Sequence, residues 1–135
     1  MIYENFSSVK LRLPYIAGFL AFREVTPLLD LLQTLKQENP DIFPQVVIVD
    51  GNGTLHPRRF GLASHLGVLA NVPTIGVGKN FLQINDGNNL TMAHVKTTVR
   101  EKLKKGGDIY LLQGQSGMIW GAVCIKKRII LTFGV

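Results

Sequence analysis

The chain has one cysteine, few acidic residues and no long apolar run. Its single cysteine, Cys124, excludes an internal disulfide, which favours a reducing compartment inside the cell and leaves cytoplasm and nucleus open. No segment reaches the roughly 18 to 20 consecutive apolar residues that cross a bilayer. Residues 1–10 lack the apolar stretch and small-residue cleavage site of a secretory leader. We therefore expect an intracellular protein without a membrane-spanning helix.

The composition is that of one globular domain with a basic surface. Its 135 residues, 46% hydrophobic and 18% charged, suffice for one packed core, so we expect a single domain over residues 1–135. Fifteen Lys and Arg against nine Asp and Glu give a net charge of +6. This balance attracts polyanions and makes nucleic acid the leading class of partner, although charge alone does not distinguish a specific site from incidental binding.

The first forty residues are predicted to hold a strand and a helix. Residues 7–13 alternate apolar and polar side chains, which is typical of a half-buried strand at a sheet edge. Thr26 is suited to a helix N-cap and Pro27 to the first helical position, and leucines then recur on one face before Pro40. The helix is therefore expected to begin near Thr26.

The next segment predicts a strand, a helix and a strand in succession. Residues 45–50 are an apolar run that ends in Asp50 and a glycine-rich turn, residues 60–69 fit a short helix, and residues 73–77 fit a second buried strand. Strands of such a βαβ unit run parallel. Asp50 and Lys79, each at the carboxyl end of its strand, should therefore lie at the same edge of the sheet.

The rest of the chain predicts a loop, a helix and more strands, which together give an α/β fold with a mixed sheet. Residues 86–89 favour a loop, and apolar residues recur at helical spacing over residues 91–105. Residues 109–112, 117–125 and 129–133 are predicted strands, the last two joined by a turn at 126–128.

Four residues could converge at that sheet edge: Glu24, Asp50, His56 and Lys79. Phosphodiester hydrolysis needs such a set, because carboxylates bind Mg²⁺ or Mn²⁺ and a cation stabilises developing phosphate charge. Each also has an ordinary interpretation, which the sequence leaves open. Glu24 could favour a helix N-terminus, Asp50 could serve only the turn, and His56 could be solvated. Lys79 ends a buried strand, which is an unusual place for a lysine without a role.

Three further features bear on the site, and two of them allow two interpretations. Tyr15 follows a proline and precedes Gly18, so it is either an exposed aromatic that stacks on bases or a core residue. His65 is expected to pack at the edge of the core. The helix over 91–105 has a basic face that either binds nucleic acid or is simply solvated, formed by Lys96, Arg100, Lys102, Lys104 and Lys105.

Three motifs in order resemble the endonuclease V family, metal-dependent nucleases that act on inosine-containing nucleic acid. The first is PYIAGFLAFRE at 14–24, and the third is PTIGVGK at 73–79. The second runs from VDGNG at 49–53 through HPR at 56–58 to FGLASHLG at 60–67. The resemblance covers roughly residues 12 to 125. It implies an RNase H-like fold and cleavage of the second phosphodiester bond 3′ to inosine in RNA or DNA, with Mg²⁺ or Mn²⁺.

The resemblance also implies roles for individual residues. Glu24 and Asp50 match the catalytic carboxylates that bind the metal, and Lys79 matches the active-site lysine. His56 and Arg58 match contacts to phosphate or to the scissile site. The strand-separating wedge corresponds to Pro14, Tyr15, Ile16 and Ala17, where the family often has proline in place of Ala17. The pocket for the flipped base corresponds to Leu20, Gly51, Gly61 and Leu82.

Two departures from the family pattern bear on activity. The family's first metal-binding aspartate lies upstream of the wedge, and before Pro14 the only acid is Glu4. Val135 stands where a histidine ligand is expected. We therefore expect the RNase H-like sheet to lack its first strands and its C-terminal helix, and to self-associate through exposed edges. The alternatives to an enzyme are an inactive inosine-binding remnant or a fragment without a function of its own.

Overall fold

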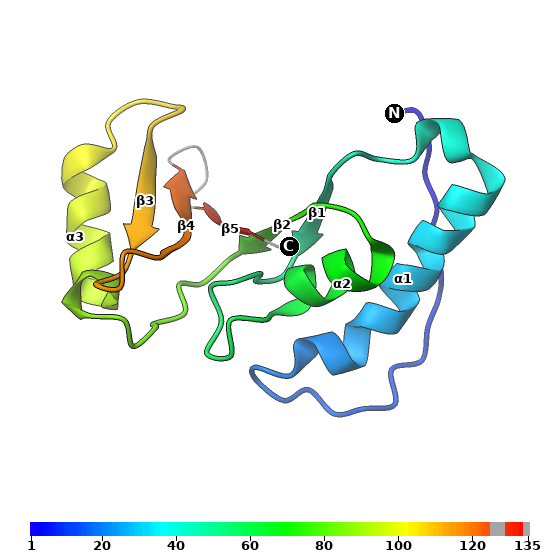
Figure 1. Cartoon of the computed structure of the whole chain (residues 1–135), viewed down its shortest axis with the longest axis horizontal. Coiled ribbons are helices and arrows are strands. Elements are labelled where there is room, and N and C mark those ends of the chain that lie inside the picture. Colours follow the sequence, from blue (N-terminus) through cyan, green and yellow to red (C-terminus); the bar gives the residue numbers. More distant parts are fainter. Residues whose placement is uncertain (125–128, 134–135) are drawn as a thin grey trace.

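The computed structural model describes residues 1–124 and 129–133 and contains a five-stranded mixed sheet in the order β1-β2-β5-β4-β3 (Figure 1). The strands are β1 (Val47–Asp50), β2 (Thr74–Gly78), β3 (Ile109–Gln113), β4 (Ile119–Cys124) and β5 (Ile129–Phe133). The helices are α1 (Leu20–Glu38), α2 (Leu62–Ala70) and α3 (Met92–Lys102), with short 3₁₀ turns η1 (Pro40–Ile42) and η2 (Asn88–Leu90). None of the described helices is long and apolar enough to cross a membrane.

The predicted βαβ unit is confirmed. Strands β1 and β2 pair in parallel, with Val47 opposite Thr74 and Asp50 opposite Val77, and α2 connects them. Every other strand pair, β2–β5, β5–β4 and β4–β3, is antiparallel. The helix predicted over 91–105 and the later strands are present within a few residues of the expected bounds, whereas the turn predicted at 126–128 lies outside the described residues.

The expected start of the first helix is wrong. Helix α1 begins at Leu20 and contains Pro27 in its interior, where the imide nitrogen cannot donate the usual helical hydrogen bond. Ala21 and Val25 are buried in one cluster with residues of β1 and α2, so extending the helix toward its N-terminus buries apolar surface that offsets the lost bond. Glu24 therefore lies inside the helix, and its interpretation as a charge at the helix N-terminus is wrong.

The strand predicted over residues 7–13 is also wrong. This segment has no strand geometry, and Figure 1 draws it as a plain trace. Val9 and Leu13 are about half exposed, at 48% and 53%. Alternating side chains form a strand only when a neighbouring strand takes their hydrogen bonds and one face is buried. Within residues 1–124 and 129–133, no strand pairs with this segment.

Two hydrophobic clusters lie at opposite ends of the sheet. One joins α1, α2 and β1, and the other joins α3 to β3, β4 and β5 (Figure 1). Leu55, in the loop between β1 and α2, is fully buried in the second cluster. The loop that follows Asp50 is therefore anchored in the cluster of α3, and several of its residues line the cavity described next.

Candidate functional site

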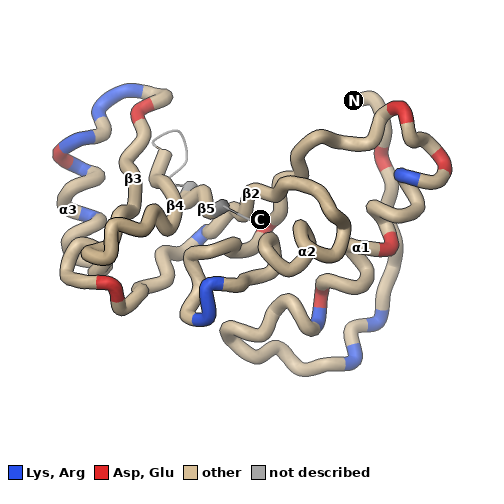
Figure 2. Tube along the Cα trace, in the orientation of Figure 1, with Lys and Arg blue, Asp and Glu red and all other residues tan. Residues whose placement is uncertain are grey.

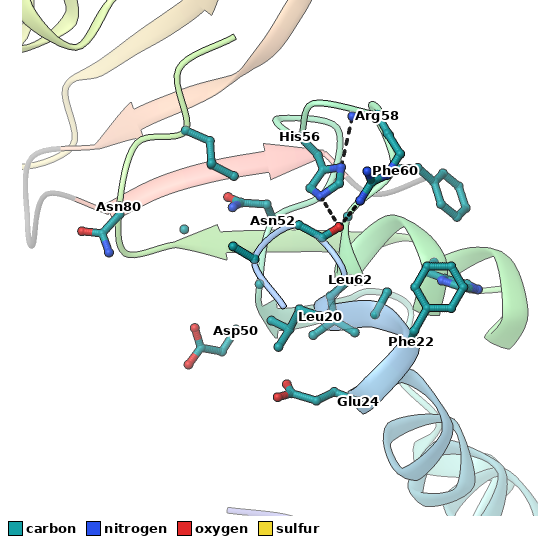
Figure 3. A pocket seen from close by; sticks show the side chains of 18 of the residues that line it. Leu20, Phe22, Glu24, Asp50, Asn52, His56, Arg58, Phe60, Leu62 and Asn80 are labelled. Carbon is teal, nitrogen blue, oxygen red and sulfur yellow. Dashed lines mark hydrogen bonds between the residues drawn. The ribbon is translucent and has the colours of Figure 1, made fainter. Parts of the chain in front are cut away.

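A cavity of about 790 Å³ opens where the start of α1, the loop after β1, the start of α2 and the end of β2 meet (Figure 3). Most of the residues predicted for a site line it. They are Tyr15, Ala17, Leu20, Glu24, Asp50, Gly51, His56, Arg58, Gly61, Lys79 and Leu82. Pro14 and Ile16 belong to the same exposed segment as Tyr15 but lie outside the cavity lining. Residues from three separate motifs thus meet at one place.

Asp50 and Lys79 lie at the same sheet edge, as the parallel βαβ unit predicts. Lys79 Nζ donates to Asp50 Oδ2 at 2.8 Å, and both side chains are largely exposed. The hydrogen bond and the charge of Asp50 raise the pKa of Lys79, so the ammonium stays charged. Asp50 therefore does more than form a turn, since its carboxylate pairs with the Lys79 ammonium beside the cavity.

Glu24 brings a second carboxylate to the cavity from α1. Figure 3 shows the carboxylates of Glu24 and Asp50 extending toward the same open side. Two carboxylates are a suitable donor set for a hard divalent cation, which completes its shell with water and phosphate oxygens. In the part of the chain that the structure describes, no cluster of three or more His, Cys, Asp or Glu could hold a metal. The donor set therefore fits part of a metal site.

His56 is buried rather than solvated, so the interpretation of a solvated loop histidine is wrong. It is 6% exposed, its Nε2 lies 3.1 Å from the Gly18 carbonyl oxygen, and its Nδ1 accepts from the Arg58 backbone N–H at 3.2 Å. Burial, followed by the nearby charge of Arg58, lowers the pKa of His56. The imidazole is therefore held neutral between two backbone groups.

The segment that carries Tyr15 is open to solvent beside the cavity. Tyr15 is 68% exposed, which confirms the prediction of an exposed aromatic and excludes a core position. The Arg58 guanidinium donates to the Gly18 carbonyl and lies over the Phe19 ring, 3.9 Å from its centroid. An aromatic ring is thus presented to solvent while the backbone behind it is held.

Glycines allow the cavity walls to approach closely. A Cβ on Gly61 would overlap the Asn52 carbonyl, and one on Gly51 would touch the Leu62 side chain at 3.0 Å. Leu20 packs against the cluster of α1 and Leu82 against the cluster of α3, so the apolar walls come from both ends of the molecule.

The exposed basic face of α3 lies at the end of the molecule opposite α1, as the blue segments of Figure 2 show. Two nearby lysines have local partners: Lys102 in the last turn of α3 lies over the Tyr110 ring, and Lys104, just beyond the helix, donates from Nζ to the Arg100 carbonyl. Cations in a last helical turn also interact favourably with the helix dipole. These contacts give the face a structural role and leave nucleic-acid binding by it a prediction.

The family profile described as Endonuclease V matches residues 1–132. The chain belongs to the endonuclease V family. It is 48% identical over 121 residues to endonuclease V of Mus musculus and 46% identical over 121 residues to that of Homo sapiens. Each match covers 90% of this chain, which spans 35% of the mouse relative and 42% of the human one.

Solved structures of endonuclease V have the same fold. The catalytic domain of the human protein superimposes with a TM-score of 0.86 at 43% identity, covering 98% of this chain and 55% of that one. Endonuclease V of Ciona intestinalis, in complex with DNA containing an inosine, gives a TM-score of 0.87 at 36% identity, covering 98% and 57%. These likenesses confirm the family predicted from the three motifs and the RNase H-like mixed sheet.

The structure adds residues that the sequence did not indicate as parts of the site. Phe22, Asn52, Phe60 and Asn80 also line the cavity. The Asn52 side-chain Oδ1 is buried and has no hydrogen-bond partner among the described residues. Its place in a glycine-rich turn indicated only turn chemistry. His65 packs between the rings of Phe22 and Phe60, which confirms it as a packed histidine at the core edge.

Proposed function

We propose that this chain carries the inosine-binding pocket and part of the catalytic centre of an endonuclease V. The reaction would be metal-dependent hydrolysis of the second phosphodiester bond 3′ to an inosine in RNA or DNA. The observation that carries the proposal is the convergence of Glu24, Asp50 and Lys79 on one cavity beside an exposed tyrosine. Membership of the family and the inosine-containing DNA bound to the Ciona relative support it.

Glu24 and Asp50 would hold the Mg²⁺ or Mn²⁺ ion. Such an ion lowers the pKa of a bound water and stabilises charge on the phosphoryl oxygens. Lys79 neutralises Asp50 at 2.8 Å in the free protein. On substrate binding its ammonium would turn to the scissile phosphate and stabilise the negative charge that develops there.

The aromatic and apolar residues of the cavity would contact the base. Tyr15 at the tip of the segment formed by residues 14–17 would separate the strands or stack where the inosine has left the helix. Leu20 and Leu82 would then contact the faces of the hypoxanthine, while Gly51 and Gly61 let the backbone come close to its edge. Phosphate contacts by His56 and Arg58 stay a prediction.

A binding module without catalysis is the second candidate function. Two carboxylates line the cavity, and the described residues offer no cluster of three metal ligands. A chain of this kind would bind inosine-containing strands selectively and would not turn them over. Equal affinity for an otherwise identical adenosine-containing strand would exclude this function.

The test is cleavage of end-labelled single-stranded RNA and DNA that carry one inosine, with Mg²⁺, Mn²⁺ or EDTA. Wild-type protein should cut one nucleotide beyond the inosine in a metal-dependent manner. The Asp50→Asn variant should lose at least about a hundredfold in rate. Mutation of residues that only hydrogen-bond to metal ligands already reduces metal affinity or activity by about 10–100-fold. Asp30→Asn, the same change at an exposed site of α1 outside the cavity lining, is the matched control. Cleavage by Asp50→Asn at the wild-type rate would exclude the metal role of Asp50.

A further inference from the structure

The Gly18 carbonyl receives two side chains from the loop after β1. His56 Nε2 lies 3.1 Å from it, and the Arg58 guanidinium donates to the same oxygen. The two contacts reach across 38 and 40 residues of sequence. We call His56, Arg58 and Gly18 the Gly18 clamp.

The hydrogen bonds of His56 define which ring nitrogen carries the proton. Nδ1 accepts from the Arg58 backbone N–H, so it has no hydrogen of its own. A neutral imidazole then carries its hydrogen on Nε2, which can donate it to the Gly18 carbonyl. Both nitrogens are satisfied in this one tautomer only. A buried histidine with a fixed tautomer and two backbone partners is a rigid connection between loop and segment.

The backbone conformation of Gly18 suits these two contacts. Gly18 has a φ of +79°, a region that side-chain-bearing residues rarely adopt. A Cβ there would lie 3.4 Å from the Arg58 guanidinium and 3.8 Å from His56 Nε2. Glycine thus turns the backbone and leaves its carbonyl close to both donors. The neighbouring Phe19 ring, stacked beneath Arg58, adds a third contact.

Little else holds the exposed segment. Ile16 accepts a local bond from the Phe19 backbone N–H at 3.0 Å, and Tyr15 and Ile16 are 68% and 54% exposed. Among residues 1–124 and 129–133, the side-chain hydrogen bonds that reach residues 12–19 all end on the Gly18 carbonyl, and the Phe22 N–H at the start of α1 donates to the Phe19 carbonyl at 3.2 Å. The position of Tyr15 beside the cavity therefore depends on the clamp.

We propose that His56 and Arg58 are positioning residues, which hold Gly18 so that the segment with Tyr15 stays over the cavity. This role differs from direct phosphate contact, because it acts on selectivity through Tyr15. The contribution to inosine selectivity rests on the proposed function. The effect of the clamp on the mobility of residues 15–18 is independent of the proposed function.

The first test measures ¹⁵N heteronuclear NOEs of residues 15–18 in four variants. Arg58→Lys keeps the charge but loses the planar fork and the stacking on Phe19, and His56→Asn loses the reach to Gly18. Both should lower the NOEs of these amides. The thermal unfolding transition of Arg58→Lys, followed by the emission of buried Trp120, should change little. His56→Gln retains a donor at the Nε2 distance and should restore much of the order. The matched control is Arg59→Lys, because Arg59 lies over Trp120 instead.

Two NMR outcomes would overturn the proposal. One is unchanged NOEs in both Arg58→Lys and His56→Asn. The other is a wild-type segment already as mobile as the exposed residues 4–9. If His56→Asn fails to fold, the exposed Arg58 still decides the test.

The second test measures binding of fluorescent inosine- and adenosine-containing single strands by anisotropy. Arg58→Lys should reduce the inosine preference by about tenfold, the worth of one or two hydrogen bonds, and Arg59→Lys should not. An equal loss of affinity for both strands, with wild-type NOEs, would make Arg58 a phosphate contact and overturn the clamp. A wild-type chain without inosine preference would defeat the proposed function, and the NOEs would still decide the clamp.

Discussion

At the scale of single residues, His56 couples stability to pH. The folded state holds this imidazole neutral, since protonation would put a hydrogen on Nδ1 and break its bond from the Arg58 N–H. Burial and the charge of Arg58 lower the pKa of His56 below its ordinary value of 6.5. The unfolded chain therefore takes up this proton at a higher pH than the folded chain does.

We expect the free energy of unfolding to fall as pH drops below about 6.5. The loss is complete once the pH is below the folded pKa of His56, and above pH 6.5 this residue adds no slope. Urea midpoints between pH 5 and 8 check this expectation. The His56→Gln chain, which cannot titrate, should show a shallower slope, and equal slopes in the two proteins would contradict the argument.

At the scale of elements, Asp86 joins the loop before η2 to the turn between β3 and β4. Its carboxylate accepts from the Ser116 N–H at 3.0 Å, the Ser116 hydroxyl at 2.6 Å and Trp120 Nε1 at 2.7 Å. The bonds from Ser116 and then from Trp120 lower the pKa of Asp86. Trp120 is 2% exposed and is the single tryptophan of the chain, so its emission reports on this junction.

Replacing Asp86 with asparagine should loosen this junction. An amide accepts at one atom instead of two and carries no charge, so the Asp86→Asn chain should unfold at lower urea and Trp120 should emit at longer wavelength. Asp108→Asn is the matched control, because the Asp108 carboxylate also accepts several hydrogen bonds, but from the backbone N–H groups of Lys104 and Lys105 just after α3. An unshifted Trp120 emission in Asp86→Asn would mean that packing alone holds the indole.

Elements whose signals are local could be predicted from the sequence. The βαβ unit followed from two apolar runs with a helical pattern between them, and the parallel pairing then placed Asp50 beside Lys79. The local signal misled at Pro27, because burial of Ala21 and Val25 extends α1 through it. It also misled at residues 7–13, where alternation has no partner strand among the described residues.

Contacts between distant segments could not be predicted in this way. The bonds from His56 to Gly18 and from Trp120 to Asp86 span 38 and 34 residues. No periodicity or capping pattern encodes such pairs. The motifs therefore indicated that His56 and Arg58 belong to the site, whereas their partner became visible only in three dimensions.

At the scale of the whole molecule, the sheet ends at β1 on one side and at β3 on the other. Across residues 1–124 and 129–133, no strand pairs with the outer edge of β1. Ile48 on this strand is 69% exposed, and Val46 just before it is 46% exposed. A groove of about 380 Å³, lined mainly by apolar residues of α1 and β1, lies next to this edge. Unpaired backbone groups beside apolar surface form a template for another strand.

We expect the chain to self-associate through the edge of β1, with a second copy as the partner. The net charge of +6 opposes unspecific contact between copies, so association at moderate salt would reflect a directed contact. Sedimentation velocity should give a mass that rises with concentration, and Ile48→Lys should lower it, since a lysine on an edge strand opposes pairing. Val68→Lys makes the same change at a 51% exposed position on α2 and should have no effect. If Ile48→Lys associates as strongly as the wild type, the contact lies elsewhere, and the exposed Ile109 and Leu111 of β3 become the next positions to change.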